Sequence, residues 1–306
     1  MSDPADRITP AFRPQQREKR APCQVGCGTG SDVRSWIGVI AQRKRTGLSD
    51  AEAYAQAWGM ITEVNPFPGV LGRICPHPCE SHCNRTDYDG ALSVNAMERF
   101  LGDWALDREL PLPRLEEDTK PEWIGVVGAG PSGLSFAYQM ARRGYRVTVY
   151  EQKEKAGGML RYGIPDYRLP QEVLDSEIRR IQDLGVELRL GVGVGTDITL
   201  EELRERHEIL YLGIGAQKGR ALGLEGESRD GVWRGTNYLE RVNRGEKIDL
   251  GRAVVVVGGG NTAIDAATYF ALTRWLGFGS MLVPAKGIAY VIGMVNSFFW
   301  NRIWII

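Results

Sequence analysis

The sequence predicts an α/β fold, with an N-terminal all-helical domain followed by a domain built on parallel strands. Two observations lead to this prediction. Residues 23–110 show apolar residues at helical spacing and contain all five cysteines. From Trp123 onward the pattern changes to strand, glycine loop, helix and strand, which is typical of βαβ units.

The composition indicates an ordinary globular protein. The chain has 306 residues, with 38 basic and 38 acidic side chains and 43% apolar residues. These values argue against extensive disorder and against a basic nucleic-acid surface. Residues 1–20 are polar and lack the apolar core of a secretory signal, so we expect a cytoplasmic location. In that compartment clustered cysteines are more often metal ligands or catalytic thiols than disulfides.

Changes of pattern along the chain divide it into segments. We expect an extended arm at 1–22, a helical domain at 23–110, a linker at 111–122, an α/β unit at 123–250, a second strand–loop–helix at 251–270 and an atypical apolar tail at 271–306.

Capping residues and apolar spacing predict the elements within these segments. In the helical domain we expect helices at 31–45 with Ser31 or Asp32 as cap, at 50–61 with Asp50 as cap, and at 94–106. In the α/β unit we expect helix 171–184, strand 186–190, helix 199–206 and strand 208–214.

The first glycine loop, at 128–133, has the form GxGxxG between an apolar strand and a helix. The first glycine makes the tight turn, the second lets backbone N–H groups approach a pyrophosphate, and the third allows close helix–strand packing. Glu151 ends the next strand, where a carboxylate accepts hydrogen bonds from a ribose. The unit therefore predicts dinucleotide binding.

Two further glycine motifs extend this prediction. Gly157-Gly158 indicates a second close approach to a long flavin dinucleotide, with a flexible surface loop as the alternative. The stretch 258–263 has the form GxGxxA after an apolar strand at 253–257. Two nucleotide loops without a Walker lysine indicate a flavin and a nicotinamide. The protein then mainly positions the rings, and we expect no catalytic acid–base residue.

The histidines and the positions of the cysteines narrow the class of flavoenzyme. His77, His82 and His207 are interpreted as polar surface residues or as supports around another group. No cysteine follows Cys83. The sequence therefore excludes flavoenzymes that use a dithiol beside the flavin.

The cysteines follow one spacing, Cys23-x3-Cys27 and Cys75-x3-Cys79-x3-Cys83. Zinc sites favour two-residue spacings, whereas thiolates placed before a flavin domain suit an iron–sulfur cluster. Zinc or buried free thiols remain the alternative. Five cysteines cannot fill two four-ligand clusters.

Several motifs together resemble one family. Between about residues 20 and 268 the chain contains, in order, APCQVGC, NPFPGVLGRICPHPCESHCNR, VNAMERF, VVGAGPSGL, GGMLRYGIPDYRLP and VVVVGGGNTAIDAA. This order resembles the glutamate synthase small-subunit family, which is similar to the N-terminal half of dihydropyrimidine dehydrogenase. The resemblance implies a helical iron–sulfur domain, then a Rossmann-like FAD domain, incomplete here, with the start of an inserted NAD(P)-binding Rossmann domain.

The resemblance also implies ligands for [4Fe–4S] clusters. Cys27, Cys75 and Cys79 would hold one cluster together with Glu98, which stands where the family has a Glu or Gln ligand. Cys23 and Cys83 match half of a second ligand set. The upstream CxxC of that set is replaced by RPQQREKR, so one cluster is expected and the second is incomplete.

The resemblance also assigns residues to the two nucleotide sites. For FAD they are Gly128, Gly130, Pro131, Ser132, Gly133, Glu151, Gly158, Met159 and Arg168; for NADPH or NADH they are Gly258, Gly260, Asn261, Thr262 and Ala263. The basic pair that reads the 2′-phosphate of NADPH in the family is not found, so the choice of nicotinamide stays open.

The last part of the chain departs from the family. After Asp265 no residue is acidic. A frameshifted or fragmentary gene is favoured, because the composition changes where the resemblance ends. A membrane-associating segment at 287–306 is the second interpretation, although Asn296, Asn301 and Arg302 weaken it. A divergent folded end is the third.

These expectations combine into one functional hypothesis. The chain is expected to be an NAD(P)H-dependent oxidoreductase subunit that passes electrons between NAD(P)H, FAD and a [4Fe–4S] cluster, to or from a partner protein of unknown identity. The alternative is a truncated, non-catalytic electron-transfer or assembly module that keeps the cluster without a working flavin site. No nucleic-acid partner is expected. Membrane association is expected only through the tail, if residues 287–306 bind a membrane.

Overall fold

The computed structural model describes residues 19–216, 219, 223, 225–251, 253–258 and 260–275, with no description of the side chains of 272–275. Most of the expected arm at 1–22 and of the expected tail at 271–306 lies outside these residues.

The region before residue 122 is helical, as predicted. Its described elements are α1 (Pro22–Val25), α2 (Val33–Thr46), α3 (Asp50–Thr62), α4 (Pro68–Ile74), α5 (Pro78–Ser81) and α6 (Val94–Leu106). The three longer helices match the predicted ones. The short α1, α4 and α5 are additions to the prediction; each has a proline at its first position, where the ring's fixed φ suits a helix and no N–H is needed.

The caps decide where the longer helices begin. Asp32 caps α2, since its carboxylate accepts the backbone N–H of Ser35 at 3.2 Å. The prediction of Asp50 as the cap of α3 is wrong. Ser49 has the extended backbone of a cap and forms a capping box with Glu52, whereas Asp50 is already helical.

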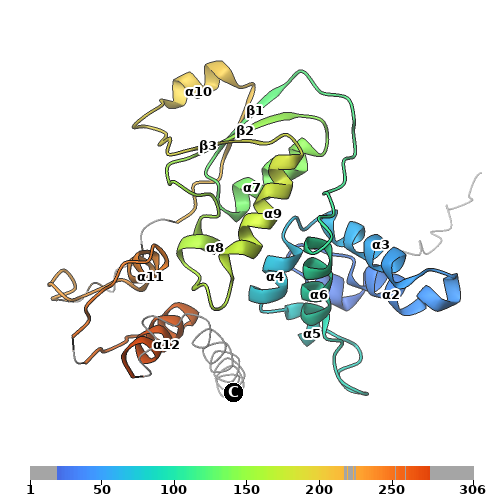
Figure 1. The fold of residues 1–306 in the computed structure, drawn as a ribbon, viewed down its shortest axis with the longest axis horizontal. Helices are drawn as coiled ribbons and strands as arrows, with labels where there is room; N and C mark the ends of the chain where they lie inside the picture. The colour runs from blue at the N-terminus through green and yellow to red at the C-terminus, as the bar shows by residue number, and fades with distance from the viewer. Residues whose placement is uncertain are drawn as a thin grey trace, which may run out of the picture.

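The second region is an α/β unit. Its described elements are β1 (Trp123–Val127), α7 (Pro131–Ala141), β2 (Arg146–Glu151), α8 (Met159–Tyr162), α9 (Gln171–Asp183), β3 (Glu187–Leu190), α10 (Leu200–Arg206), β4 (Ile209–Leu212), α11 (Gly235–Asn243) and α12 (Asn261–Trp275). Figure 1 shows this unit beside the helical region.

The strands form a parallel sheet in the order β3-β2-β1-β4. Apolar side chains of α7 and α9 pack with β1 and β2 on one face. Leu203 of α10 packs against Val127 and Tyr150 on the other face. Both faces of the central strands are therefore covered, which explains why β1 and β2 are almost entirely buried.

The interpretation of His207 as a polar surface residue is wrong. Its ring is 4% exposed and lies edge-on to Trp123 and Tyr150, and Nε2 is 3.0 Å from the Tyr150 hydroxyl. Burial lowers the pKa of His207, so the ring is neutral in the core.

The predicted strand at 253–257 does not form. This stretch has no strand structure, and Val255 and Val257 are 88% and 74% exposed. A strand needs a neighbour for its backbone N–H and C=O groups, and no described segment pairs with it. The helix that follows does form, and α12 packs against Tyr238, Leu239 and Val242 of α11.

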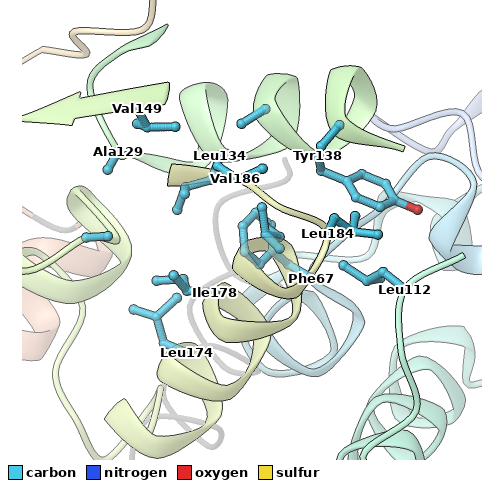
Figure 2. Close-up of a cluster of buried hydrophobic side chains, with 14 of the residues drawn as sticks. Phe67, Leu112, Ala129, Leu134, Tyr138, Val149, Leu174, Ile178, Leu184 and Val186 are labelled. Atoms are coloured by element: carbon cyan, nitrogen blue, oxygen red, sulfur yellow. The ribbon is translucent and has the colours of Figure 1, made fainter. Parts of the chain in front are cut away.

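One core joins the helical region to the α/β unit (Figure 2). Phe67, before α4, and Leu112, in the expected linker, insert between α7 and α9 beside Tyr138 and Ile178. The stretch at 111–122 is therefore not a free tether, because Leu112 is 4% exposed within this shared core.

We call residues 62–70 the bridging turn. It connects the end of α3 to the start of α4, and side chains of α7 bind its first carbonyl groups. The Thr62 carbonyl accepts the Tyr138 hydroxyl at 2.5 Å, and the Glu63 carbonyl accepts Nη1 of Arg142 at 2.9 Å. A cation at the C-terminal end of α3 also interacts favourably with the helix dipole.

The other end of the bridging turn is held by Glu177 of α9. Its carboxylate accepts the backbone N–H groups of Gly69 and Val70 at 2.7 and 3.1 Å. These groups are in the first turn of α4 and have no partner within the helix. Glu177 is fully buried, with Arg180 and Arg73 nearby. The α/β unit thus supplies a cation for one helix end and a carboxyl group for the next.

We predict that Glu177 makes the stability of the protein depend on pH. Burial raises the pKa of Glu177 to about 8, whereas an unfolded chain has about 4.3. The folded protein therefore binds the proton more tightly, and the free energy of unfolding falls as the pH rises from about 5 to 8. Urea unfolding across this range should show a smaller fall in Glu177→Gln. Glu172→Gln, an exposed change on α9, should follow the wild type; equal slopes in all three proteins would contradict the prediction.

Candidate functional site

The glycine loop at 128–133 joins β1 to α7, as predicted. Gly130 precedes the helix and Pro131 occupies its first position. At Gly133 an added Cβ would overlap the carbonyl oxygen of Gly128. Glycine is thus required here for the close packing of α7 on the loop. The first backbone N–H groups of α7 point out of the helix start, where they can bind an anionic phosphate.

Glu151 lies at the end of β2 beside this loop. Its Oε2 accepts the N–H of Ala129 at 2.8 Å and its Oε1 accepts the N–H of Lys153 at 3.0 Å. These bonds fix the carboxylate, which is 8% exposed. Each oxygen has a second lone pair. The residue therefore fits the predicted role as an acceptor for a ribose hydroxyl.

The second glycine motif packs directly on the first. The N–H of Gly157 donates to the Ala129 carbonyl at 2.7 Å. Gly158 has φ +51°, and an added Cβ there would lie 2.7 Å from the Cα of Gly130. The alternative of a flexible surface loop does not match this packing. Met159, the first residue of α8, is 45% exposed at the same place.

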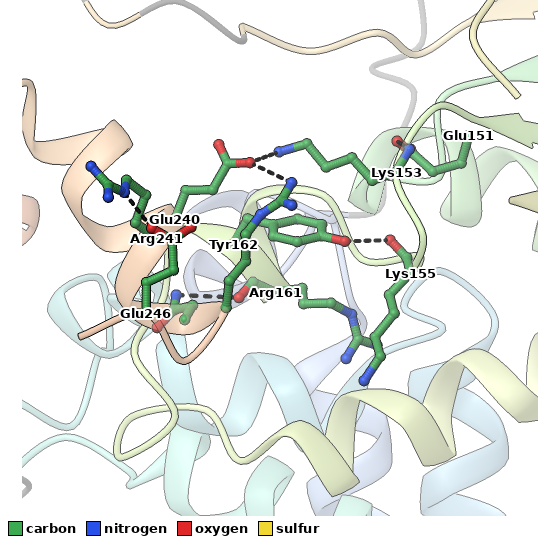
Figure 3. Close-up of polar contacts among 10 residues, drawn as sticks. Glu151, Lys153, Lys155, Arg161, Tyr162, Glu240, Arg241 and Glu246 are labelled. Carbon is green, nitrogen blue, oxygen red and sulfur yellow. Dashed lines mark hydrogen bonds and ion pairs between the residues drawn. The ribbon is translucent and has the colours of Figure 1, made fainter. Parts of the chain in front are cut away.

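A polar network attaches α11 to this region (Figure 3). Glu240 accepts Nζ of Lys153 at 2.6 Å and Nη2 of Arg244 at 3.0 Å. The Lys153 ammonium also lies 4.1 Å from the centre of the Tyr162 ring of α8. The amide of Asn243 donates to the carbonyls of Arg161 and Ile164. The chain after Lys153 is therefore held by a helix distant in sequence.

Arg168, which the resemblance assigns to the FAD site, forms an ion pair with α12. Its Nη1 lies 2.8 Å from Oδ2 of Asp265, and the Tyr167 hydroxyl donates to Oδ1 at 2.9 Å. Asp265 is buried and follows the GxGxxA motif at 258–263. The structure thus balances the charge of Arg168 with a carboxylate from the expected nicotinamide segment.

The predicted nicotinamide residues are only partly arranged as expected. Asn261, Thr262 and Ala263 begin α12, as a nucleotide-binding helix start would, and Gly258 has φ +121°. The strand that should support the loop is missing, as described above. Asn261 and Thr262 are exposed.

None of the five cysteines is in a disulfide. Cys75 and Cys79 are close enough to interact electrostatically with each other and with Cys27, and Cys75 interacts also with Glu98. Cys23 interacts with Cys83. The resemblance assigns Cys27, Cys75, Cys79 and Glu98 to one ligand set, and this assignment stays a prediction. Cys75 directly follows α4, Cys79 lies in α5, Glu98 lies in α6 and Cys27 follows α1.

The chemistry of this set fits an iron–sulfur cluster. Burial raises the pKa of Cys79 to about 12 and also raises that of Cys75, with neighbouring thiols and Glu80 adding to it. Iron cations offset such crowding of negative charge, as in other cysteine-ligated clusters. No group of three or more His, Cys, Asp or Glu among the described residues is close enough to share one metal ion. A cubic cluster holds its ligands further apart than one ion does.

Asn65 is hydrogen-bonded to Glu98, the carboxylate assigned to the first ligand set. Burial raises the pKa of Glu98 to about 7, while a hydrogen bond from Asn65 lowers it. The amide Nδ2 of Asn65 donates to Oε1 of Glu98 at 2.8 Å. The sequence analysis gave no role to Asn65 or Glu177 and missed α11. The roles of Asn65 and Glu177 depend on which distant segments meet, whereas the apolar spacing of Tyr238, Leu239 and Val242 could have indicated α11.

Family models match three stretches of the chain. "Dihydropyrimidine dehydrogenase domain II, 4Fe-4S cluster" matches residues 6–110, and "Pyridine nucleotide-disulphide oxidoreductase" matches residues 122–275, about half of the 306 residues. The chain belongs to the pyridine nucleotide-disulphide oxidoreductase family. The predicted oxidoreductase class, with an iron–sulfur domain before the nucleotide domain, is confirmed.

Curated relatives confirm the resemblance to the glutamate synthase small-subunit family. The NADPH-Fe(3+) oxidoreductase subunit beta of Geobacter sulfurreducens is 35% identical over 250 residues, covering 80% of this chain and 36% of that protein. The glutamate synthase [NADPH] small chain of Mycobacterium tuberculosis is 31% identical over 256 residues, covering 79% of this chain and 51% of that protein. The chain thus spans about a third to a half of the length of these relatives.

A solved structure shares a weaker likeness. The 2-naphthoyl-CoA reductase complex aligns at 21% identity with a TM-score of 0.44, covering 84% of this chain and 40% of that chain.

The end of the chain matches a different family. "GtrA/DPMS, transmembrane domain" matches residues 255–305, which overlap the second family match between 255 and 275. Within the part of the chain that the structure describes, no helix has both the length and the apolar character needed to cross a membrane.

We predict that Gly133→Ala disrupts the glycine loop. The added methyl group meets the Gly128 carbonyl, so α7 must move away from β1, and overpacking of this kind costs roughly 1–3 kcal/mol. Urea unfolding of the variant checks this. Gly38→Ala is the matched control, because an added Cβ there has no neighbour within 4 Å and α2 gains helix propensity. Equal stability of Gly133→Ala and the wild type would contradict the proposed packing.

Proposed function

We propose that this chain is a subunit of an NAD(P)H-dependent oxidoreductase that passes electrons between NAD(P)H, FAD and a [4Fe–4S] cluster, to or from a partner protein. One observation carries the proposal: Cys27 raises the pKa of the thiols of Cys75 and Cys79, and Glu98 that of Cys75, in a helical region that shares a core with a glycine-loop domain. The relatives named as NADPH-dependent subunits support the same assignment.

The proposed domains follow the sequence boundaries. Residues 23–110 would form the iron–sulfur domain, 111–122 the connection and 123–250 a Rossmann-like FAD domain, and 251–270 would belong to an NAD(P)-binding domain. The parallel order β3-β2-β1-β4, with the glycine loop after β1, supports the Rossmann assignment.

The chain's own residues would bind and orient the cofactors. FAD supplies a ring that accepts hydride and releases single electrons, and the cluster carries single electrons. Gly128, Gly130, Pro131, Ser132 and Gly133 would cradle the pyrophosphate, and Glu151 would accept the ribose hydroxyls.

Other residues would surround the flavin and the nicotinamide. Gly158 and Met159 would line the flavin side, with Arg168 close by. Gly258, Gly260, Asn261, Thr262 and Ala263 would approach the nicotinamide nucleotide. Cys23 and Cys83 would serve an incomplete second set.

Anaerobic reconstitution with FAD, iron and sulfide tests the proposal. The purified chain should show flavin absorbance and chelatable iron, and it should oxidise NADPH with an artificial acceptor. A colourless, iron-free product would reject the proposal. A cluster without flavin or NADPH oxidation would favour the alternative of a non-catalytic electron-transfer module.

The two cysteine sets give a sharper prediction within this experiment. Cys79→Ser should abolish most of the iron, because a serine hydroxyl is a poor iron ligand compared with a thiolate. Cys83→Ser removes a thiol from the same stretch but from the other set, so it should retain the first cluster. Iron content and the absorbance of the reduced and oxidised proteins check this. Equal loss of iron in both variants would contradict the division into sets.

A second proposal concerns membrane association. The match of residues 255–305 to a transmembrane family favours it, together with the lack of acidic residues after Asp265. In this proposal the tail anchors the chain to a bilayer.

Membrane fractionation tests this second proposal. The full chain should sediment with membranes and be released by detergent. A Val291→Asp/Val295→Asp double variant should move to the soluble fraction, since each buried charge costs about 2.5–3.5 kcal/mol at the centre of a membrane helix. A full chain that stays soluble without detergent would contradict membrane anchoring.

A further inference from the structure

Asn65 lies at the centre of the bridging turn and is almost fully buried, at 1% exposure. Its Oδ1 accepts the backbone N–H of Phe67 at 2.9 Å, while its Nδ2 donates to Oε1 of Glu98 at 2.8 Å. The orientation of the amide follows from these partners, because a backbone N–H can only donate and a carboxylate accepts. One side chain therefore ties Glu98, which is 33 residues away, to the turn.

The turn itself is held by the α/β unit. Tyr138 and Arg142 bind the carbonyl groups that precede Asn65, and Glu177 binds the N–H groups that follow it. Phe67 inserts into the core between α7 and α9. Asn65 is thus placed by contacts from the glycine-loop domain rather than by the helices around the cysteines alone.

Close packing of α4 on α6 places Glu98 near the cysteines. At Gly72 an added Cβ would lie 2.5 Å from the backbone nitrogen of Arg99, the residue after Glu98. Cys75 follows directly at the end of α4. The backbone position of Glu98 is fixed by this packing, and the direction of its carboxylate is fixed by Asn65.

We infer that Asn65 is a positioning residue for the cluster: it holds one carboxylate oxygen of Glu98 so that the other is presented to iron. This inference rests on the proposed function. The amide N–H also withdraws electron density from the carboxylate, which makes Glu98 a weaker donor to iron. The flavin side of the protein thereby influences a cluster ligand through the bridging turn.

Asn65→Asp isolates this role. The introduced carboxylate keeps the oxygen that accepts the Phe67 N–H, so the turn is preserved, but it replaces the donor with an oxygen that faces the Glu98 carboxylate. We expect roughly tenfold weaker retention of the cluster against an iron chelator, as befits the loss of one charge-assisted hydrogen bond. The electron paramagnetic resonance spectrum of the reduced cluster should change as well.

The double variant Asn65→Asp/Glu98→Gln supplies the rescue. Its glutamine amide can donate to the introduced aspartate, which restores the hydrogen bond with the donor and acceptor exchanged, and leaves the glutamine carbonyl oxygen for iron. Cluster retention should return toward that of Glu98→Gln alone. Asn237→Asp, the same change at an exposed asparagine of α11, should keep the wild-type spectrum.

The outcomes separate this inference from the proposed function. A wild-type chain that takes up no cluster rejects the proposed function itself. A wild-type cluster with an unchanged spectrum and chelation rate in Asn65→Asp overturns the positioning role. Failure of the double variant to recover also overturns it, because Asn65 would then act otherwise than through Glu98.

Discussion

The contacts that hold the bridging turn are the constraint on which the two halves of the molecule depend. Helix α3 ends and α4 begins within residues 62–70, so unsatisfied carbonyl and N–H groups lie close together in a buried place. Arg142 and Tyr138 supply donors for the carbonyl end, and Glu177 supplies acceptors for the N–H end. Each side chain has the charge or polarity that the helix end favours. The shared core around Phe67 then excludes water from these bonds.

The same packing relates the candidate flavin and cluster sites. Helix α7 begins at the glycine loop and carries Tyr138 and Arg142 toward its other end. Helix α9 carries Leu174, which packs near Gly157, and Glu177 one turn later. Both helices thus contact a glycine motif and the bridging turn. In the proposed function, these two helices would connect the flavin site to the cluster site.

The GxGxxA motif at 258–263 shows that a local sequence pattern needs neighbouring segments to form its expected structure. Apolar residues at 253–257 followed by GGGNTA resemble a nucleotide-binding strand and loop, and the helix after them does form. The valines stay exposed because no described strand lies beside them. Two family models overlap between residues 255 and 275, so this stretch matches both of them. Asp265 is buried against Arg168 and Tyr167, and this attaches α12 to the segment that follows α8.

The three longer N-terminal helices, the first strand–glycine loop–helix–strand unit and the family can be read from the amino-acid sequence, whereas α1, α4, α5 and α11 are not predicted and the predicted strand at 253–257 does not form. Caps and apolar spacing are local, which is why α6 and the glycine loop after β1 appear as predicted. Which side chains meet depends on packing. Which thiols affect one another, such as Cys83 on the pKa of Cys23 and Cys27 on that of Cys75, depends on packed helices and not on the equal spacing of the cysteines. Asn65 and Glu177 have no local signature, because their partners lie 33 and more than 100 residues away. Hydrogen bonds across such separations depend on how the chain packs, and only the folded chain brings their atoms together.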